Sequence, residues 1–208
     1  MPSSFELGMD KSRIKYRFCS SAFMYNTLQN YGDKSIVFDT RDPKFFEEMH
    51  INNAISLTSE KIQQGSQMQD SDVYKDLNVD VIQTFLTNDE KARFSKRRRC
   101  FCFIILHHEQ LCSTLAQKIK EIAQYDEIFD DYFELDPESF LTHWNRLESG
   151  TSNNNLSCTI GLNLFQSLME DKVRETYILF DGAVSFFTKY HFYKTLCLAY
   201  PLSKSLNI

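Results

Sequence analysis

Residues 107–112 form the segment of this 208-residue chain that comes nearest to a reactive site. They follow an apolar run at residues 100–106 and precede Ser113, where the next helix is predicted to begin. A thiol near the start of a helix and close to histidines has a lowered pKa and becomes a nucleophile. Cys112 is therefore the candidate for covalent chemistry. The whole segment consists of His107, His108, Glu109, Gln110, Leu111 and Cys112.

Other kinds of catalytic or metal site are not supported by the residue spacing. The six cysteines include no CxxC pair and no Cys/His cluster of zinc spacing, so we expect no metal site. His107 and His108 leave a strand end in opposite directions, which lets only one of them face a metal ion. With only six glycines, a glycine-cradled phosphate site is not expected either, and we predict no cofactor. A Cys-x5-Arg phosphatase motif is missing, because Lys118 stands where the arginine would be.

The elements that would position this segment alternate between short apolar runs and amphipathic stretches. This alternation predicts an α/β fold with a central, mostly parallel sheet of about five strands and helices on both faces. Residues 101–106 are apolar on both sides, which is typical of a central strand. The other predicted strands are 14–18, 35–38, 54–57 and 177–180. The predicted helices are 22–28, 44–49, 73–86, 113–125, 136–147 and 160–169, and the predicted loops are 58–72, 126–138 and 149–157.

Two segments carry a resemblance to a known family. Residues 36–42 (IVFDTRD), followed by Phe45 and Phe46 and then by HINNAI at 50–55, resemble the opening of a rhodanese domain. Residues 177–187 (YILFDGAVSFF) look like the closing strand, Gly-Gly turn and Phe-bearing helix of the same family, with Asp181 in place of the first glycine. The closing segment is most similar to the rhodanese-like domain of MAP kinase phosphatases and their pseudophosphatase relatives. The matched motif residues are Asp39, Arg41, Asp42, His50 and Gly182.

The resemblance implies a rhodanese-like fold whose active-site loop has lost its chemistry. In active members a cysteine follows the central strand, and backbone N–H groups of a short loop stabilise its thiolate. Here His107 occupies that position, and Cys112 stands at the far end, where an anion-binding arginine is common. We therefore expect a catalytically inactive, protein-binding or scaffolding domain, with a sulfurtransferase or thiol-redox enzyme using Cys112 as the alternative. Asp39, Arg41 and His50 are expected to fix loops structurally, since buried polar groups need partners in any function.

The resemblance also sets the expected domain organisation. We expect a flexible N-terminus at 1–13, a rhodanese-like domain at 14–198 and a C-terminal tail at 199–208. Insertions are expected near 58–96 and 126–170.

One dense basic run stands out in an otherwise acidic chain of net charge -5. MAP kinase phosphatases use an arginine-rich segment to dock on a kinase, which suggests a MAP kinase-like kinase or a larger assembly as partner. The alternative is a solvated face that keeps a sheet edge soluble. The candidate partner-binding residues are Arg93, Lys96, Arg97, Arg98 and Arg99. We expect charge reversal at residues 97–99 to leave the melting temperature unchanged.

The charge and the N-terminal sequence bear on binding class and location. A negative net charge argues against a general nucleic-acid or anionic-membrane binder. The longest apolar run is far shorter than the roughly 20 residues that span a bilayer. Residues 1–10 have no signal-peptide pattern. We expect a cytoplasmic protein, and the basic run also fits a nuclear localisation signal.

Overall fold

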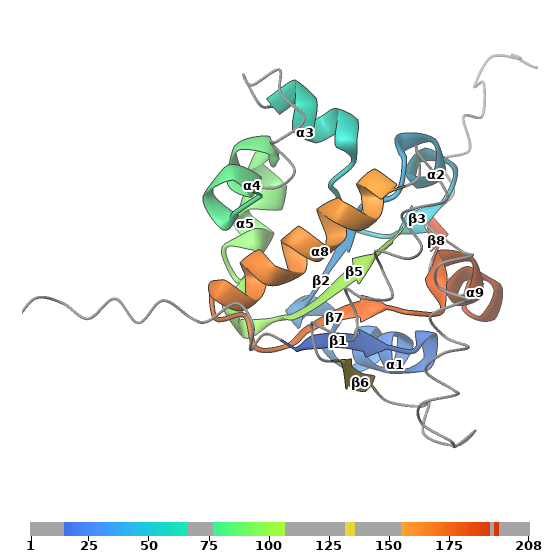
Figure 1. Ribbon diagram of the computed structural model, residues 1–208. Helices are drawn as coiled ribbons and strands as arrows, with labels where there is room; N and C mark the ends of the chain where they lie inside the picture. The colour runs from blue at the N-terminus through green and yellow to red at the C-terminus, as the bar shows by residue number, and fades with distance from the viewer. Residues whose placement is uncertain (1–14, 66–76, 107–131, 136–154, 192–193, 196–208) are drawn as a thin grey trace, which may run out of the picture.

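A computed structural model describes residues 15–65, 77–106, 132–135, 155–191 and 194–195 of the chain. These residues form an α/β fold built around one six-stranded sheet, with strand order β4-β2-β5-β7-β1-β6 (Figure 1). Five of the strands run parallel, as the sequence predicts, and β6 pairs antiparallel with β1 at one edge. The bounds are β1 Tyr16–Cys19, β2 Ser35–Asp39, β4 Ile55–Ser56, β5 Phe101–Ile105, β6 Tyr132–Leu135 and β7 Thr176–Leu179.

A second, two-stranded sheet joins the middle of the chain to its C-terminal part. In it β3 (His50–Ile51) pairs antiparallel with β8 (Lys194–Thr195). His50 lies opposite Thr195 in this pairing.

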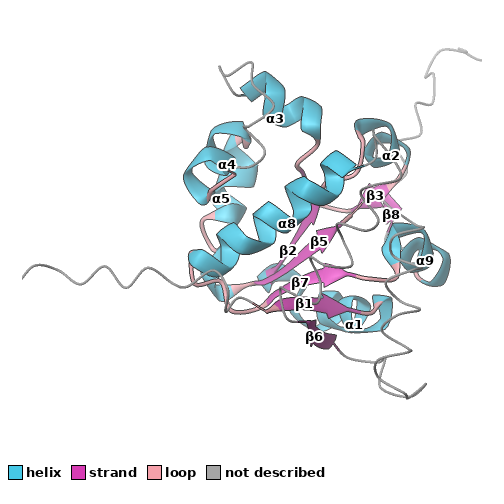
Figure 2. Ribbon diagram, in the orientation of Figure 1, coloured by secondary structure: helices cyan, strands magenta, loops and turns pink. Residues whose placement is uncertain are grey.

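Helices cover both faces of the main sheet, as predicted (Figure 2). Helices α1, α2 and α9 pack on one face and α3, α4, α5 and α8 on the other. Strand β5 shows why both faces need cover, because Cys102 and Ile104 belong to one core while Phe103 and Ile105 belong to the other. The bounds are α1 Ser21–Tyr31, α2 Pro43–Glu48, α3 Ser59–Gly65, α4 Val79–Phe85, α5 Asn88–Phe94, α8 Asn155–Glu170 and α9 Gly182–Lys189.

Besides β3 and β8, which were not predicted, three elements differ from the sequence prediction. The polar stretch 58–72 was predicted as a loop, but Ser59–Gly65 is helix α3, which buries Ile62. Helix α5 was not predicted, although Thr87 and Glu90 form a capping box at its start. The acidic stretch 126–138 was predicted as a loop, but Tyr132–Leu135 is strand β6. The predicted helices at 113–125 and 136–147 lie outside the described residues.

Helix α8 packs closely on the carboxyl end of β5 because Gly161 has no side chain. A Cβ atom at Gly161 would overlap with Leu106 Cδ2 and lie 3.3 Å from Ile104 Cγ2. Leu106 is itself buried, so it has little room to move aside.

Among the described helices, none is long and apolar enough to cross a membrane.

Gly161→Ala is expected to lower the free energy of unfolding by about 1–3 kcal/mol, because the added methyl overpacks the contact between α8 and β5. Urea denaturation measures the change. Gly32→Ala is the matched control, since a Cβ at that exposed position meets nothing within 4 Å. An equal loss in both variants would contradict the close contact.

Candidate functional site

The carboxyl ends of β2 and β5 are the place where this topology favours a ligand. After β2 the chain adds β4 on one side of β2. After β5 it adds β6 and then β7, which both lie on the other side of β5. The two neighbouring strands thus diverge, and crevices at such switch points hold ligands in open α/β sheets. The loop after β2 begins at Thr40, and residues 107–112 follow β5 after Leu106.

In the described part of this switch point, buried groups from the loop after β2, from β5 and from α8 contact one another. Thr40 is 1% exposed, and its hydroxyl donates to the carbonyl oxygen of Ile105 at 3.0 Å. The hydroxyl oxygen of Thr40 also lies 3.0 Å from Ser157 O and 3.1 Å from Ser157 Oγ. Ser157 belongs to the first turn of α8, which therefore lies over the strand ends. Leu106, 3% exposed, packs beneath Gly161 of the same helix.

Asp39 and Arg41 form a closed ion pair at the start of the loop after β2. Asp39 is fully buried and Arg41 is 5% exposed. Arg41 donates from Nη2 to Asp39 Oδ2 at 2.7 Å and from Nε to Asp39 Oδ1 at 2.9 Å. Its backbone N–H also donates to Asp39 Oδ1 at 3.1 Å. This bidentate arrangement uses the carboxylate within the loop itself.

The remaining contacts of Arg41 connect two helices to this loop. Nη2 donates to the carbonyl oxygen of Met49 at 2.6 Å, at the end of α2. The guanidinium carbon lies 5.6 Å from the ring centroid of Phe187 in α9, within the range of a cation–π contact. Arg41 is therefore held by α2, α9 and Asp39 together.

The other residues of the matched motif also make local structural contacts. His50 Nδ1 lies 2.7 Å from the carbonyl oxygen of Phe46, and the two rings stack with centroids 4.1 Å apart. Asp42 precedes Pro43 at the start of α2 but makes no side-chain cap hydrogen bond. Gly182 opens α9 with a φ of 78°, a left-handed conformation that favours glycine.

The degenerate loop His107–Cys112 predicted from the sequence lies outside the described residues, so its placement rests on the sequence. The four described cysteines are buried and free. Burial raises the pKa of Cys19, and the negative charge of Asp181 raises it further. Burial is also the main cause that raises the pKa values of Cys100 and Cys102. None of these three thiols has the lowered pKa of a reactive cysteine. The described residues contain no group of three potential metal ligands.

The basic run is joined to the rest of the fold through Asp171, at the end of α8. Arg97 donates from Nε to Asp171 Oδ2 at 2.7 Å, and Arg98 donates from Nη2 to Asp171 Oδ1 at 2.6 Å. Burial raises the pKa of Asp171, but hydrogen bonds and positive charge from Arg98 and Arg97 outweigh this and lower it below its ordinary value. Arg93 donates from Nη1 to the carbonyl oxygen of Asn53.

These contacts divide the five predicted partner-binding residues into two groups. Arg93, Arg97 and Arg98 are engaged within the fold. Lys96 and Arg99 are exposed and form no ion pair within the described part of the chain. The expectation that reversing residues 97–99 leaves the melting temperature unchanged conflicts with this geometry, because two of the three hold Asp171.

Sequence reasoning missed both the contact of Thr40 with Ser157 and the ion pairs of Asp171. Thr40 and Ser157 are separated by 117 residues, and no local pattern connects them. Asp171 lies 74 residues from Arg97. The one available signal was a pair of carboxylates, Glu170 and Asp171, directly after a predicted helix, which is too common to identify a partner.

Asp171→Asn is expected to lower the free energy of unfolding at pH 7 by about 1–3 kcal/mol, because two arginines lose a charged acceptor. The lowered pKa of Asp171 in the folded state sets the sign. The stabilisation is present above the ordinary value of 3.8 and is lost as pH falls through the lower, folded-state value. Urea titrations should therefore show a difference from the wild type that is largest at pH 7 and shrinks as the pH is lowered below 3.8. A difference in unfolding free energy that stays constant with pH would contradict the ion pairs of Asp171 with Arg97 and Arg98.

The chain gives no match that would assign it a family. No model of a known protein family matches it, and no curated protein sequence matches it.

Proposed function

We propose that the chain is a catalytically inactive, rhodanese-like domain that binds other proteins as a regulatory or scaffolding module, in the cytoplasm or the nucleus. The observation that carries the proposal is the set of hydrogen bonds among the described polar groups at the switch point. Thr40 and Ser157 satisfy each other and the carbonyl oxygen of Ile105 in the place where this topology would hold a ligand.

The contacts of the family-like motif support the same proposal. Asp39 and Arg41 bind each other, and His50 contacts the carbonyl oxygen of Phe46. Side chains committed to such contacts hold loops in place. A catalytic group instead needs its side chain directed at a substrate atom.

The competing function is a sulfurtransferase or thiol-redox enzyme using Cys112. Sulfur transfer from thiosulfate to cyanide distinguishes the two. The scaffold proposal predicts that the full-length wild type and Cys112→Ser give the same rate as a reaction without protein, because Cys112 stands at the far end of the loop, away from the reactive position. Cys158→Ser, which removes a buried thiol, controls for nonspecific effects. Turnover that disappears in Cys112→Ser alone would refute the scaffold proposal.

For the partner we propose a protein with an acidic docking surface, such as a MAP kinase-like kinase or a component of a larger assembly. Lys96 and Arg99 are the members of the basic run that would carry the contact, because their charges are exposed and are not joined to Asp171. Arg97 and Arg98 would position the run rather than bind.

Lys96→Glu and Arg99→Glu are each expected to reduce the amount of partner captured from native cells, measured by quantitative mass spectrometry, without lowering the melting temperature by more than about 1–2 °C. Arg97→Glu should lower the melting temperature, because it faces Asp171. Lys44→Glu is the matched control, since it makes the same charge change on α2. Capture that is unaffected by Lys96→Glu and Arg99→Glu would reduce the run to a solvated face.

A further inference from the structure

Strand β4 leaves the backbone of one residue free at the edge of the sheet. In the described part of the chain β4 pairs only with β2, and it ends the strand order. The N–H of Leu57 donates to the carbonyl oxygen of Asp39 at 2.9 Å, toward β2. Because successive residues of a strand direct their backbone groups to opposite sides, the N–H and C=O of Ser56 point away from the sheet. Unpaired groups of this kind are a template for another strand.

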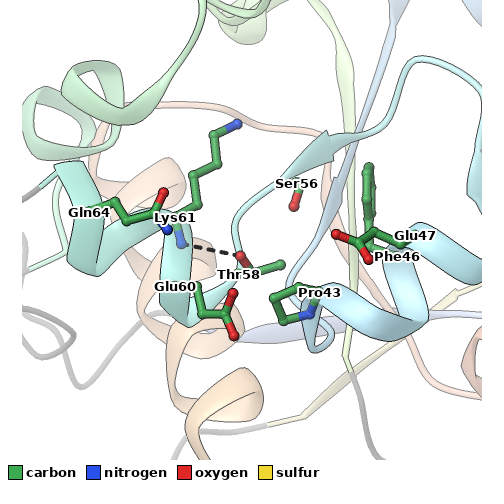
Figure 3. A pocket seen from close by; sticks show the side chains of 8 residues that line it. All are labelled: Pro43, Phe46, Glu47, Ser56, Thr58, Glu60, Lys61 and Gln64. Carbon is green, nitrogen blue, oxygen red and sulfur yellow. Dashed lines mark hydrogen bonds between the residues drawn. The ribbon is translucent and has the colours of Figure 1, made fainter.

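A cavity lies beside this free backbone, between the first turns of α2 and α3. Its volume is about 260 Å³, and it is open to solvent. Figure 3 shows the Ser56 hydroxyl directed toward it, with α2 on one side and α3 on the other. The lining residues are Pro43, Phe46, Glu47, Ser56, Thr58, Glu60, Lys61 and Gln64.

The charge of this cavity is negative. Lys61 directs its side chain away from the other residues drawn in Figure 3, and its Nζ lies 2.9 Å from both carboxylate oxygens of Glu90. That lysine is thus neutralised outside the cavity. Glu47 and Glu60 are exposed at the cavity and form no ion pair with any described residue. Two carboxylates without a counterion favour a cationic occupant.

The walls are held in place without an occupant. The ring of Phe46 stacks on His50, whose Nδ1 contacts the carbonyl oxygen of Phe46. On the other side, Thr58 Oγ1 accepts a hydrogen bond of 3.3 Å from the backbone N–H of Lys61 at the start of α3. Binding to a preformed site costs less free energy, because the side chains that line the site are already ordered.

We propose that an extended segment of a partner protein adds to the free edge of β4 through the N–H and C=O of Ser56. It places a lysine or arginine side chain in the cavity between Glu47 and Glu60. Strand addition supplies the affinity through main-chain hydrogen bonds, and the cavity selects the side chain. This surface lies at the carboxyl ends of the strands, whereas the basic run lies before β5. The strand-addition site is therefore separate from the proposed docking by Lys96 and Arg99 and does not depend on that docking.

The experiment uses the ¹⁵N-labelled full-length chain and capped octapeptides of alternating Thr and Val with a central Lys or a central Gln. The Lys peptide should shift the amide resonance of Ser56 and its neighbours and bind about fivefold more tightly than the Gln peptide. In the Glu47→Gln, Glu60→Gln double variant this preference should disappear. Glu48→Gln, an exposed carboxylate on the same helix that does not line the cavity, should keep it.

A second pair of variants tests the backbone contact. Ser56→Pro removes the outward N–H, which an edge strand tolerates, and should abolish binding, whereas Ser56→Ala keeps the N–H and should bind normally. The proposal is overturned if neither peptide binds the wild type, if the Lys preference survives in the double variant, or if Ser56→Pro binds like Ser56→Ala. It is also overturned if light scattering shows a dimer of the wild type that the Glu47→Gln, Glu60→Gln double variant does not form, because a second copy would then be the occupant.

Discussion

The buried ion pair of Asp39 and Arg41 sets the geometry of the whole carboxyl end of the sheet. A fully buried carboxylate requires a paired cation, and Arg41 supplies it while also reaching Met49 and the ring of Phe187. The loop after β2 is therefore fixed, which places Thr40 against Ile105 and Ser157. Because replacing such a pair by apolar side chains is often neutral, we attribute to it the selection of one loop conformation and not a large net stabilisation.

The fold was predictable wherever burial leaves a periodic mark on the sequence. Strand β5 is apolar on both sides because both faces are covered, and helix α8 buries a stripe that includes Leu164 and Leu168. Helix α3 escaped prediction because Ile62 is its one buried residue, and β6 escaped it because an edge strand needs no apolar run. In the candidate site, Asp39, Arg41 and His50 were found through their motif. The contact of Thr40 with Ser157 is set by tertiary packing alone.

Positive charge and negative charge are arranged at opposite ends of the parallel strands. The basic run lies before β5, where Asp171 removes two arginines from the exposed set. The carboxylates of Glu47 and Glu60 line the cavity at the carboxyl end of β4, where the nearby Lys61 forms an ion pair with Glu90. In both places internal ion pairs decide which charges remain for a partner. Counting charges in the sequence therefore overestimates the basic surface and overlooks the acidic one.

The order of strands in the sheet differs from the order in which the ribosome releases them. Strand β1 is the first to emerge, yet its two neighbours are β7 and β6, and β7 ends only at Leu179. At ordinary translation rates this separation amounts to roughly ten to thirty seconds. Until β6 is complete at Leu135, Tyr16 and Phe18, which are buried in the finished fold, have no described sheet partner. Strands β2, β4 and β5 can pair once Ile105 is released, but completion of the sheet is a late event in synthesis, which leaves the apolar N-terminal strand exposed to aggregation in the meantime.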